Sequence, residues 1–166
     1  MNREPIKAIA DIISHELNIA SSRIFLMNSL RELPKDDELF VVIQETTFPP
    51  FGLKKEYLTK ANGTYVEKLS YMAKQVVTIS LLSKNTNARL QKYDVNLALN
   101  STYSQQIQEQ YGFHISITNP VANRSFLEET SRLYRYDTEA TVITGYLKEN
   151  TVDYYDKFSD EITLEP

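Results

Sequence analysis

Residues 67–81 read EKLSYMAKQVVTISL, and their odd and even positions carry different kinds of side chain. The odd positions are mostly apolar or aromatic and the even positions mostly polar, and this period of two predicts a β-strand. About 15 residues in strand geometry span roughly 50 Å, well beyond the usual strand of about 3–10 residues. We therefore predict a strand that either bends midway or projects beyond the domain.

Further alternating or apolar segments predict the rest of a sheet. A second long alternating run covers residues 131–147, and shorter strands are predicted at residues 24–26 and 113–117. Residues 39–43 lack polar alternation, so both faces of that strand should be covered. Asn62-Gly63 predicts a tight hairpin turn into the strand at 67–81, because both turn residues accept a positive φ.

A pair of helices is predicted between the two long strands. Asn85 or Asn87 can cap the first helix, Ser101 can cap the second, and Gly112 can end it. The first helix would carry four apolar residues on one face: Leu90, Tyr93, Leu97 and Ala98.

An amphipathic helix is predicted at residues 4–17, with Pro5 suited to its first position and Asn18 able to end it. Strands in neighbouring runs, rather than strict βαβ alternation, favour an α+β fold. We predict a mainly antiparallel sheet with long strands, packed by this N-terminal helix and the central helix pair. The domain would span residues 1–152, followed by an acidic segment at 153–166.

Composition excludes several classes of protein. The chain has 166 residues and no cysteine, which excludes disulfide scaffolds and thiolate metal sites. No apolar run approaches the roughly 20 residues of a membrane helix, and residues 1–17 lack a signal peptide's apolar core, so we expect no membrane partner. Residues 153–166 carry five acids and one lysine. The net charge of −4 for the whole chain therefore leaves residues 1–152 neutral. A neutral body argues against a dedicated DNA-binding stripe.

The residues that usually carry catalysis are sparse. His15 and His114 have no second histidine or cysteine at metal-ligand spacing. The four glycines lie too far apart to form a phosphate-binding loop. We expect no catalytic residues, no cofactor and no metal site, and hence no enzymatic activity.

Tyrosine is the most informative residue type in the chain. There are eleven tyrosines and no tryptophan, and tyrosine is enriched at protein interfaces. Several tyrosines alternate with lysines around Asn62-Gly63, a mixture that can also bind single-stranded nucleic acid. Nearby glutamates dilute these lysines, which favours a solvated, lysine-protected hairpin instead.

Three regions together resemble the phage neck terminator-like proteins, the head–tail joining and tail-completion proteins of tailed phages and prophages. The regions are LNIASSRIF (17–25) followed by LFVVIQ (39–44), QVVTISLL (75–82) running into the helix at 88–99, and ITNPVANRSF (117–126) followed by RLYRYD (132–137). They cover roughly residues 5–147, and the segment from Pro120 to Asp137 carries the most telling part.

The resemblance implies a virion structural protein of the phage neck, assembled in the host cytoplasm. Such a subunit forms a ring, typically a hexamer, that terminates or completes the tail and joins it to the head. Its partners would be further copies of itself, tail-tube or sheath proteins, and head–tail connector or collar proteins. DNA would pass through the lumen without specific binding, and a neutral-to-acidic chain suits that role because each neutralised phosphate adds affinity.

Head-to-tail ring contacts need two different surfaces on each subunit. The candidate contact residues are Tyr57, Tyr65 and Tyr71 of the hairpin, Asn123, Arg124 and Phe126 of the loop before the last strand, and Arg132 and Arg135 of that strand. Arg132 and Arg135 could pair with acids of a neighbouring subunit, and Arg135 could equally pair with an acid of its own subunit. The alternative function is a small cytoplasmic α+β adaptor that binds a partner protein or single-stranded nucleic acid.

Overall fold

The computed structural model of the chain describes residues 4–27, 32, 34–117, 119–128 and 131–151. The acidic segment at 153–166 lies outside the described residues. The helices are α1 (Pro5–Glu16), the 3-10 turn η1 (Ser21–Arg23), α2 (Asn87–Leu90), α3 (Asp94–Leu99) and α4 (Thr102–Tyr111). The strands are β1 (Ile24–Leu26), β2 (Phe40–Thr47), β3 (Phe51–Thr59), β4 (Tyr65–Ser83), β5 (Phe113–Ile117), β6 (Ala122–Asn123), β7 (Phe126–Glu128) and β8 (Ser131–Thr151).

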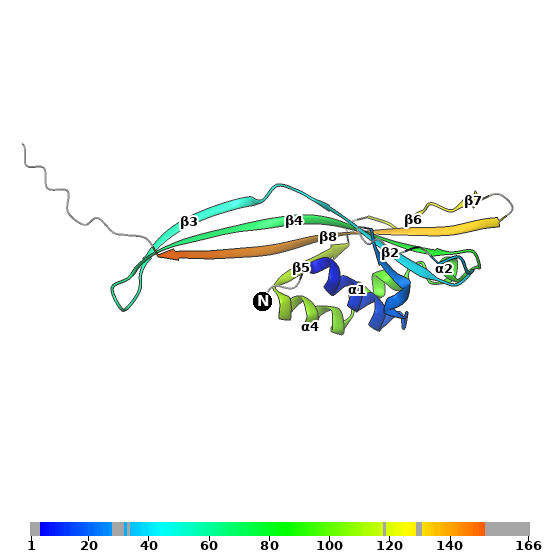
Figure 1. Cartoon of the computed structure of the whole chain (residues 1–166), viewed down its shortest axis with the longest axis horizontal. Helices are drawn as coiled ribbons and strands as arrows, with labels where there is room; N and C mark the ends of the chain where they lie inside the picture. The colour runs from blue at the N-terminus through cyan, green and yellow to red at the C-terminus, as the bar shows by residue number, and fades with distance from the viewer. Residues whose placement is uncertain (1–3, 28–31, 33, 118, 129–130, 152–166) are drawn as a thin grey trace, which may run out of the picture.

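The two long strands β4 and β8 form the backbone of the fold. They pair antiparallel from Val66↔Thr151 to Ser83↔Tyr134 without a register shift. Figure 1 shows this ladder running almost the whole length of the molecule, with the helices gathered under one half of it. The predicted long strand is therefore confirmed, and it projects beyond the domain.

The other strands attach along the edges of this ladder. The sheet order is β1-β2-β4-β8-β5, in which β1 and β2 are parallel and the remaining pairs antiparallel. β2 and β3 follow one another along the same edge of β4, β2 opposite residues 75–82 and β3 opposite residues 65–72. Pro49-Pro50 lies between them, where the missing N–H groups interrupt the ladder. The predicted α+β fold with a mainly antiparallel sheet is confirmed.

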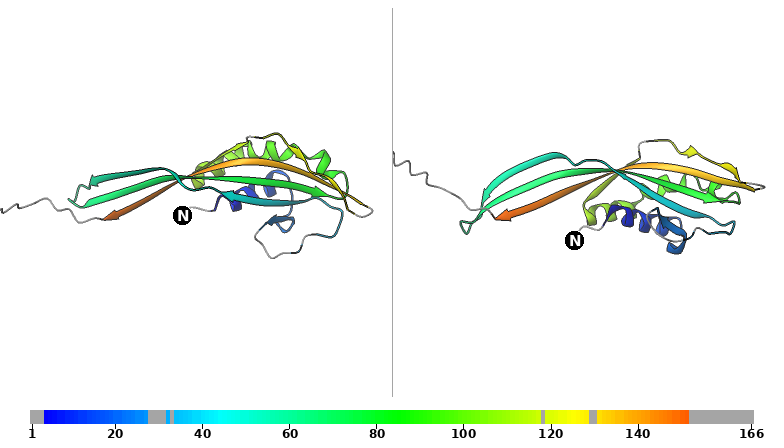
Figure 2. Two further views of the ribbon diagram at one scale, coloured as in Figure 1. Left: turned by 90° about the horizontal axis from the view of Figure 1, so that it is seen from above. Right: turned by 45° about the horizontal axis from the view of Figure 1, so that its top comes forward.

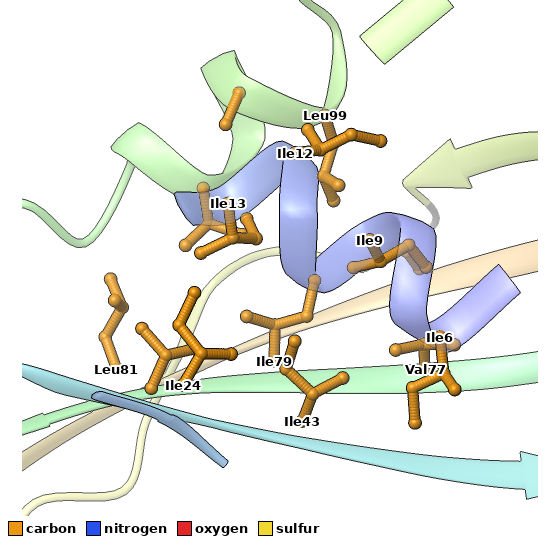
Figure 3. Packing of buried hydrophobic residues seen from close by; sticks show 14 of the residues in the cluster. Ile6, Ile9, Ile12, Ile13, Ile24, Ile43, Val77, Ile79, Leu81 and Leu99 are labelled. Carbon is orange, nitrogen blue, oxygen red and sulfur yellow. The ribbon is translucent and has the colours of Figure 1, made fainter. Parts of the chain in front are cut away.

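The core lies between the helices and one face of the sheet, which we call the helix side. Ile9, Ile12 and Ile13 of α1 are fully buried, as are Val77 and Ile79 of β4. Figure 3 shows Ile12 beside Leu99 of α3, on the side of α1 away from the strands. Each such side chain contributes about 1.5–3 kcal/mol relative to an exposed one. α1 begins with Pro5 and ends before Asn18, whose φ of 52° stops the helix.

The second predicted helix of the central pair has the expected ends. The Ser101 hydroxyl accepts a hydrogen bond from the Ser104 N–H at 3.0 Å, and Gly112 ends α4 in the left-handed region. Gln108 ties this helix to the sheet, because its side-chain oxygen accepts the Ile115 N–H at 2.8 Å. α4 therefore holds β5 against the edge of β8.

The prediction for the first helix of that pair was wrong about which residues are buried. The chain turns at residues 91–93 and forms two short helices, α2 and α3. Leu90 and Leu97 are 74% and 69% exposed, and Tyr93 is also exposed. Because the helix is interrupted, one helical period does not describe the segment. The buried residues are instead Ala88, Val95, Ala98 and Leu99.

Two turns also differ from the sequence prediction. The hairpin at Asn62-Gly63 exists, but the loop runs through residues 60–64 and only Gly63 has a positive φ. The Asn62 side-chain oxygen instead accepts the Thr64 N–H at 3.1 Å, which fixes the loop. The predicted loop at 120–130 contains the short strands β6 and β7, both paired with β8.

Substitutions at a core residue and at an exposed residue test this assignment of buried and exposed side chains. Ile9→Ala should lower the free energy of unfolding by about 2–5 kcal/mol, because it leaves a cavity in the core. Leu90→Ala, the matched control in α2, should change it by less than about 0.5 kcal/mol. Chemical denaturation of the two variants checks both values. An equally large loss at Leu90 would contradict the split into α2 and α3.

Candidate assembly surface

Half of the β4–β8 ladder extends beyond the helices as a three-stranded arm. We define the arm as β3 together with residues 65–73 of β4 and 144–151 of β8. At the base of the arm, Thr144 and Tyr146 line a pocket together with Pro5 and Ile6 of α1. Beyond this base no described helix covers the arm (Figure 2). Every residue of β3 except Glu56 is exposed.

The helix side of the sheet continues onto the arm as a tyrosine face, formed by Tyr57, Tyr65, Tyr71 and Tyr146. The rings of Tyr57 and Tyr65 stack with centroids 5.9 Å apart, and those of Tyr71 and Tyr146 stack at 5.1 Å. The three tyrosines predicted from the sequence therefore lie on one surface. Tyr146 was not among the predicted contact residues. The alternating pattern of the last strand predicted the face of the sheet on which Tyr146 lies, but only the β4–β8 register places it opposite Tyr71.

An ion pair fixes the centre of the tyrosine face. Lys55 Nζ lies 2.5 Å from a carboxylate oxygen of Glu67 and 5.1 Å from the centroid of the Tyr57 ring. The hydrogen bond from Lys55 holds the pKa of Glu67 below its ordinary value, and the same bond, with a smaller contribution from Tyr57, raises the pKa of Lys55. This lysine is therefore engaged within its own arm.

The opposite side of the arm is an apolar face formed by Phe51, Leu58, Met72 and Leu147. All four side chains are about half exposed. Their facing follows from the register, which pairs Phe51 with Met72 and Leu58 with Val66, and places Leu147 opposite Ser70. Ion pairs border this face: Lys54 with Glu56 at 2.5 Å and Lys60 with Glu149 at 3.1 Å.

The arm therefore exposes large apolar or aromatic side chains on both of its faces. An isolated two-stranded hairpin is marginally stable in water, and a sheet gains stability from further strands with a hydrophobic face or from packing against a helix. Contiguous exposed apolar patches are typical of protein–protein contact sites. The arm has the composition of a surface that a partner covers.

The second predicted contact region lies at the other end of the molecule. In Figure 1, β6 and β7 are at the end opposite the arm. The Asn123 side-chain oxygen accepts hydrogen bonds from the N–H and hydroxyl of Ser125, so it shapes the turn, and the residue is exposed. Phe126 and Arg124 are exposed there. The structure thus places the predicted residues in two separate regions.

The predicted arginines of the last strand have different environments. Arg135 donates to both carboxylate oxygens of Asp137, at 2.9 and 3.1 Å, and to the Ser80 hydroxyl at 3.3 Å. Its partner therefore lies in its own chain, one of the two alternatives left open by the sequence. Arg132 belongs to β8 opposite Leu127, and its side chain lies outside the described residues.

Other parts of the described chain offer little for chemistry. Within these ranges, no group of three or more histidine, aspartate or glutamate side chains is placed to hold a metal ion. His15 stacks on Tyr103 with ring centroids 3.9 Å apart, and His114 is exposed. Among the described residues, no helix has the length and apolar character needed to cross a membrane.

Comparison with known proteins adds no family assignment. No family model matches the chain, and no curated protein matches it.

The ion pair of the tyrosine face can be tested by titration. The Glu67 carboxyl should titrate below its ordinary pKa of 4.5, so its contribution to stability is present above pH 4.5 and lost as the pH falls through the lowered value. Carbon-detected NMR of the carboxyl group measures the midpoint. Lys55→Met should return the midpoint towards 4.5. Lys54→Met, the control, should act on Glu56 instead. A Glu67 midpoint unchanged by Lys55→Met would contradict the described pair.

Proposed function

We propose that this protein is a structural subunit of the phage neck that forms a ring, completes or terminates the tail and joins it to the head connector. The observation that carries the proposal is the arm. It is a sheet built into the main ladder of the fold, yet both of its faces are left for other molecules to cover. An assembly subunit needs such an element, whereas an isolated globular protein gains nothing from it.

Two further features support an assembly role. The arm and the α2–β7 end of the body are different surfaces at opposite ends of the molecule (Figure 1). Different surfaces on one subunit are what a ring of head-to-tail contacts requires. The net charge of −4 also suits a channel for DNA, because a lumen without excess positive charge does not hold the phosphates.

The alternative is a cytoplasmic adaptor whose arm binds a partner protein or single-stranded nucleic acid. Stacked tyrosines beside lysines are the feature that favours nucleic acid. However, Lys54, Lys55 and Lys60 each pair with a glutamate of the arm, so these cations are already neutralised. This pairing favours contact with protein over contact with phosphate.

Negative-stain microscopy tests the proposed function. The sample is the protein mixed with assembled phage tail tubes, because a subunit that assembles only on its template stays monomeric alone. We expect rings seated at one end of each tube. Tyr57→Ser should reduce the fraction of capped tubes, whereas Gln105→Ser, an exposed control on α4, should leave it unchanged.

A folded monomer that forms no rings and binds no tube end would contradict the neck role. In that case, salt-sensitive binding to single-stranded oligonucleotides would support the adaptor. Failure to bind them would leave a protein partner as the adaptor's ligand.

A further inference from the structure

We propose that the acidic segment at 153–166 of one copy of this chain adds as a β-strand to the open edge of β3 in a second copy. The inference specifies a contact between neighbouring subunits of the proposed ring, and it rests on that proposed function. It concerns the edge of the arm, where backbone groups can bind a strand, and neither of the arm's two faces.

β3 is an edge strand of the arm. It pairs with β4 on one side, and no described strand pairs with its other side. Figure 1 shows β3 as an outer strand of the arm. An open edge presents unpaired backbone N–H and C=O groups, which bind an added strand through a new ladder of hydrogen bonds. The nine residues of β3 are long enough for such a ladder.

The arm has a second open edge on β8, and charge distinguishes the two edges. The pairing of β8 with β5 ends at Thr144, so no described strand lies outside residues 145–151. Residues 145–151 carry one lysine and one glutamate, and so do residues 65–73 of β4. Residues 51–64, which are β3 and the hairpin loop, carry three lysines and one glutamate. The net charge of +2 on the arm therefore comes entirely from β3 and its loop.

The ion pairs of the arm do not remove this positive excess. Lys55 and Lys60 pair with Glu67 of β4 and Glu149 of β8. Both glutamates belong to strands whose own charges balance, so the arm as a whole still carries two more lysines than glutamates.

The acidic segment has the charge that this edge attracts. Its five acids and one lysine give a net charge of −4, against +2 on residues 51–64. At the base of the arm, Lys74 and Glu45 add one charge of each sign and leave the balance unchanged. Opposite charges favour an acidic strand at the edge of β3, whereas the lysines there repel a second β3.

The segment also has the sequence pattern of a strand. Its even positions are mostly apolar or aromatic and include Tyr154, Phe158, Ile162 and Leu164. Its odd positions are mostly polar and include Asp153, Lys157, Ser159, Glu161, Thr163 and Glu165. This period of two predicts a half-buried strand. Residues 154–164 in strand geometry span about 36 Å, which is enough to follow β3 along its length.

The sequence favours a second copy as the receiver over the same chain. β8 runs towards the tip of the arm and ends at Thr151, near Val66 of β4. The segment would reach its own β8 edge only through a tight reversal. Residues 152–165 contain no glycine or asparagine, the residues that two-residue hairpin turns favour. A strand that continues the direction of β8 instead reaches another molecule, and such a contact between two different elements continues from subunit to subunit.

Cysteine cross-linking tests the contact, because the natural chain contains no cysteine. Leu58→Cys and Ser159→Cys are prepared as separate proteins, assembled together on tail tubes and treated with a short bismaleimide. We expect a cross-linked dimer in the mixture. Leu147→Cys mixed with Ser159→Cys is the matched control, because Leu147 lies on the other open edge and is 59% exposed, against 48% for Leu58. We expect no dimer from this control mixture.

The outcomes separate this inference from the proposed function. Rings without a Leu58–Ser159 cross-link, or with an equally strong Leu147–Ser159 cross-link, overturn the strand addition while the ring role stands. A single chain carrying Leu147→Cys and Ser159→Cys that cross-links within itself also overturns it. A Leu58–Ser159 dimer without rings supports the contact between copies and contradicts the neck role. The absence of both rings and cross-links overturns both.

Proline substitution tests whether the contact is a strand pairing. Consecutive residues of a strand direct their N–H groups to opposite sides, and proline has no N–H group. In the Ser159→Cys chain, either Asp160→Pro or Glu161→Pro should lower the yield of cross-linked dimer about fivefold, because a ladder hydrogen bond is lost. Asp160→Ala and Glu161→Ala, which lose the same charges, should lower it less than about twofold. Yields with both prolines equal to those of the alanine controls overturn the strand addition.

Discussion

The β4–β8 ladder is the constraint on which the rest of the structure depends. Its pairs continue from Ser83↔Tyr134 in the body to Val66↔Thr151 at the far end without a break in register. The helical layer covers only the body half of this ladder (Figure 2). A single pair of strands therefore belongs to two environments, and the uncovered half is the part that we propose another molecule covers.

The side chains of β4 differ between these two environments. On the helix side, Val77 and Ile79 are fully buried under α1, whereas Tyr71 on the same side stacks on Tyr146 at the margin of the helical layer, where both side chains are only half-buried. Tyrosine rings carry a polar hydroxyl and therefore tolerate partial exposure to water better than purely aliphatic side chains do. The lysine–glutamate pairs and the outward lysines of β3 also discourage indiscriminate pairing at its open edge.

Much of the fold could be predicted from the sequence, because period and capping are local signals. The alternation at 67–81, the isoleucine spacing of α1 and the caps Ser101 and Gly112 all predicted elements that the structure confirms. The interruption of the helix at residues 91–93 was not predicted, because no proline or glycine lies there. The tyrosines of the hairpin were predicted, but the apolar face was not. Its members come from β3, β4 and β8, and only tertiary register brings them together.

Hydrogen–deuterium exchange tests most directly the claim that the arm depends on a partner. The amides of residues 67–73 in the arm are compared with those of residues 77–81 in the core, in the isolated chain and in the assembled state. The account predicts that arm amides exchange much faster than core amides in the isolated chain and slow to similar rates on assembly. Arm amides as protected as the core in the isolated chain, with no change on assembly, would contradict it.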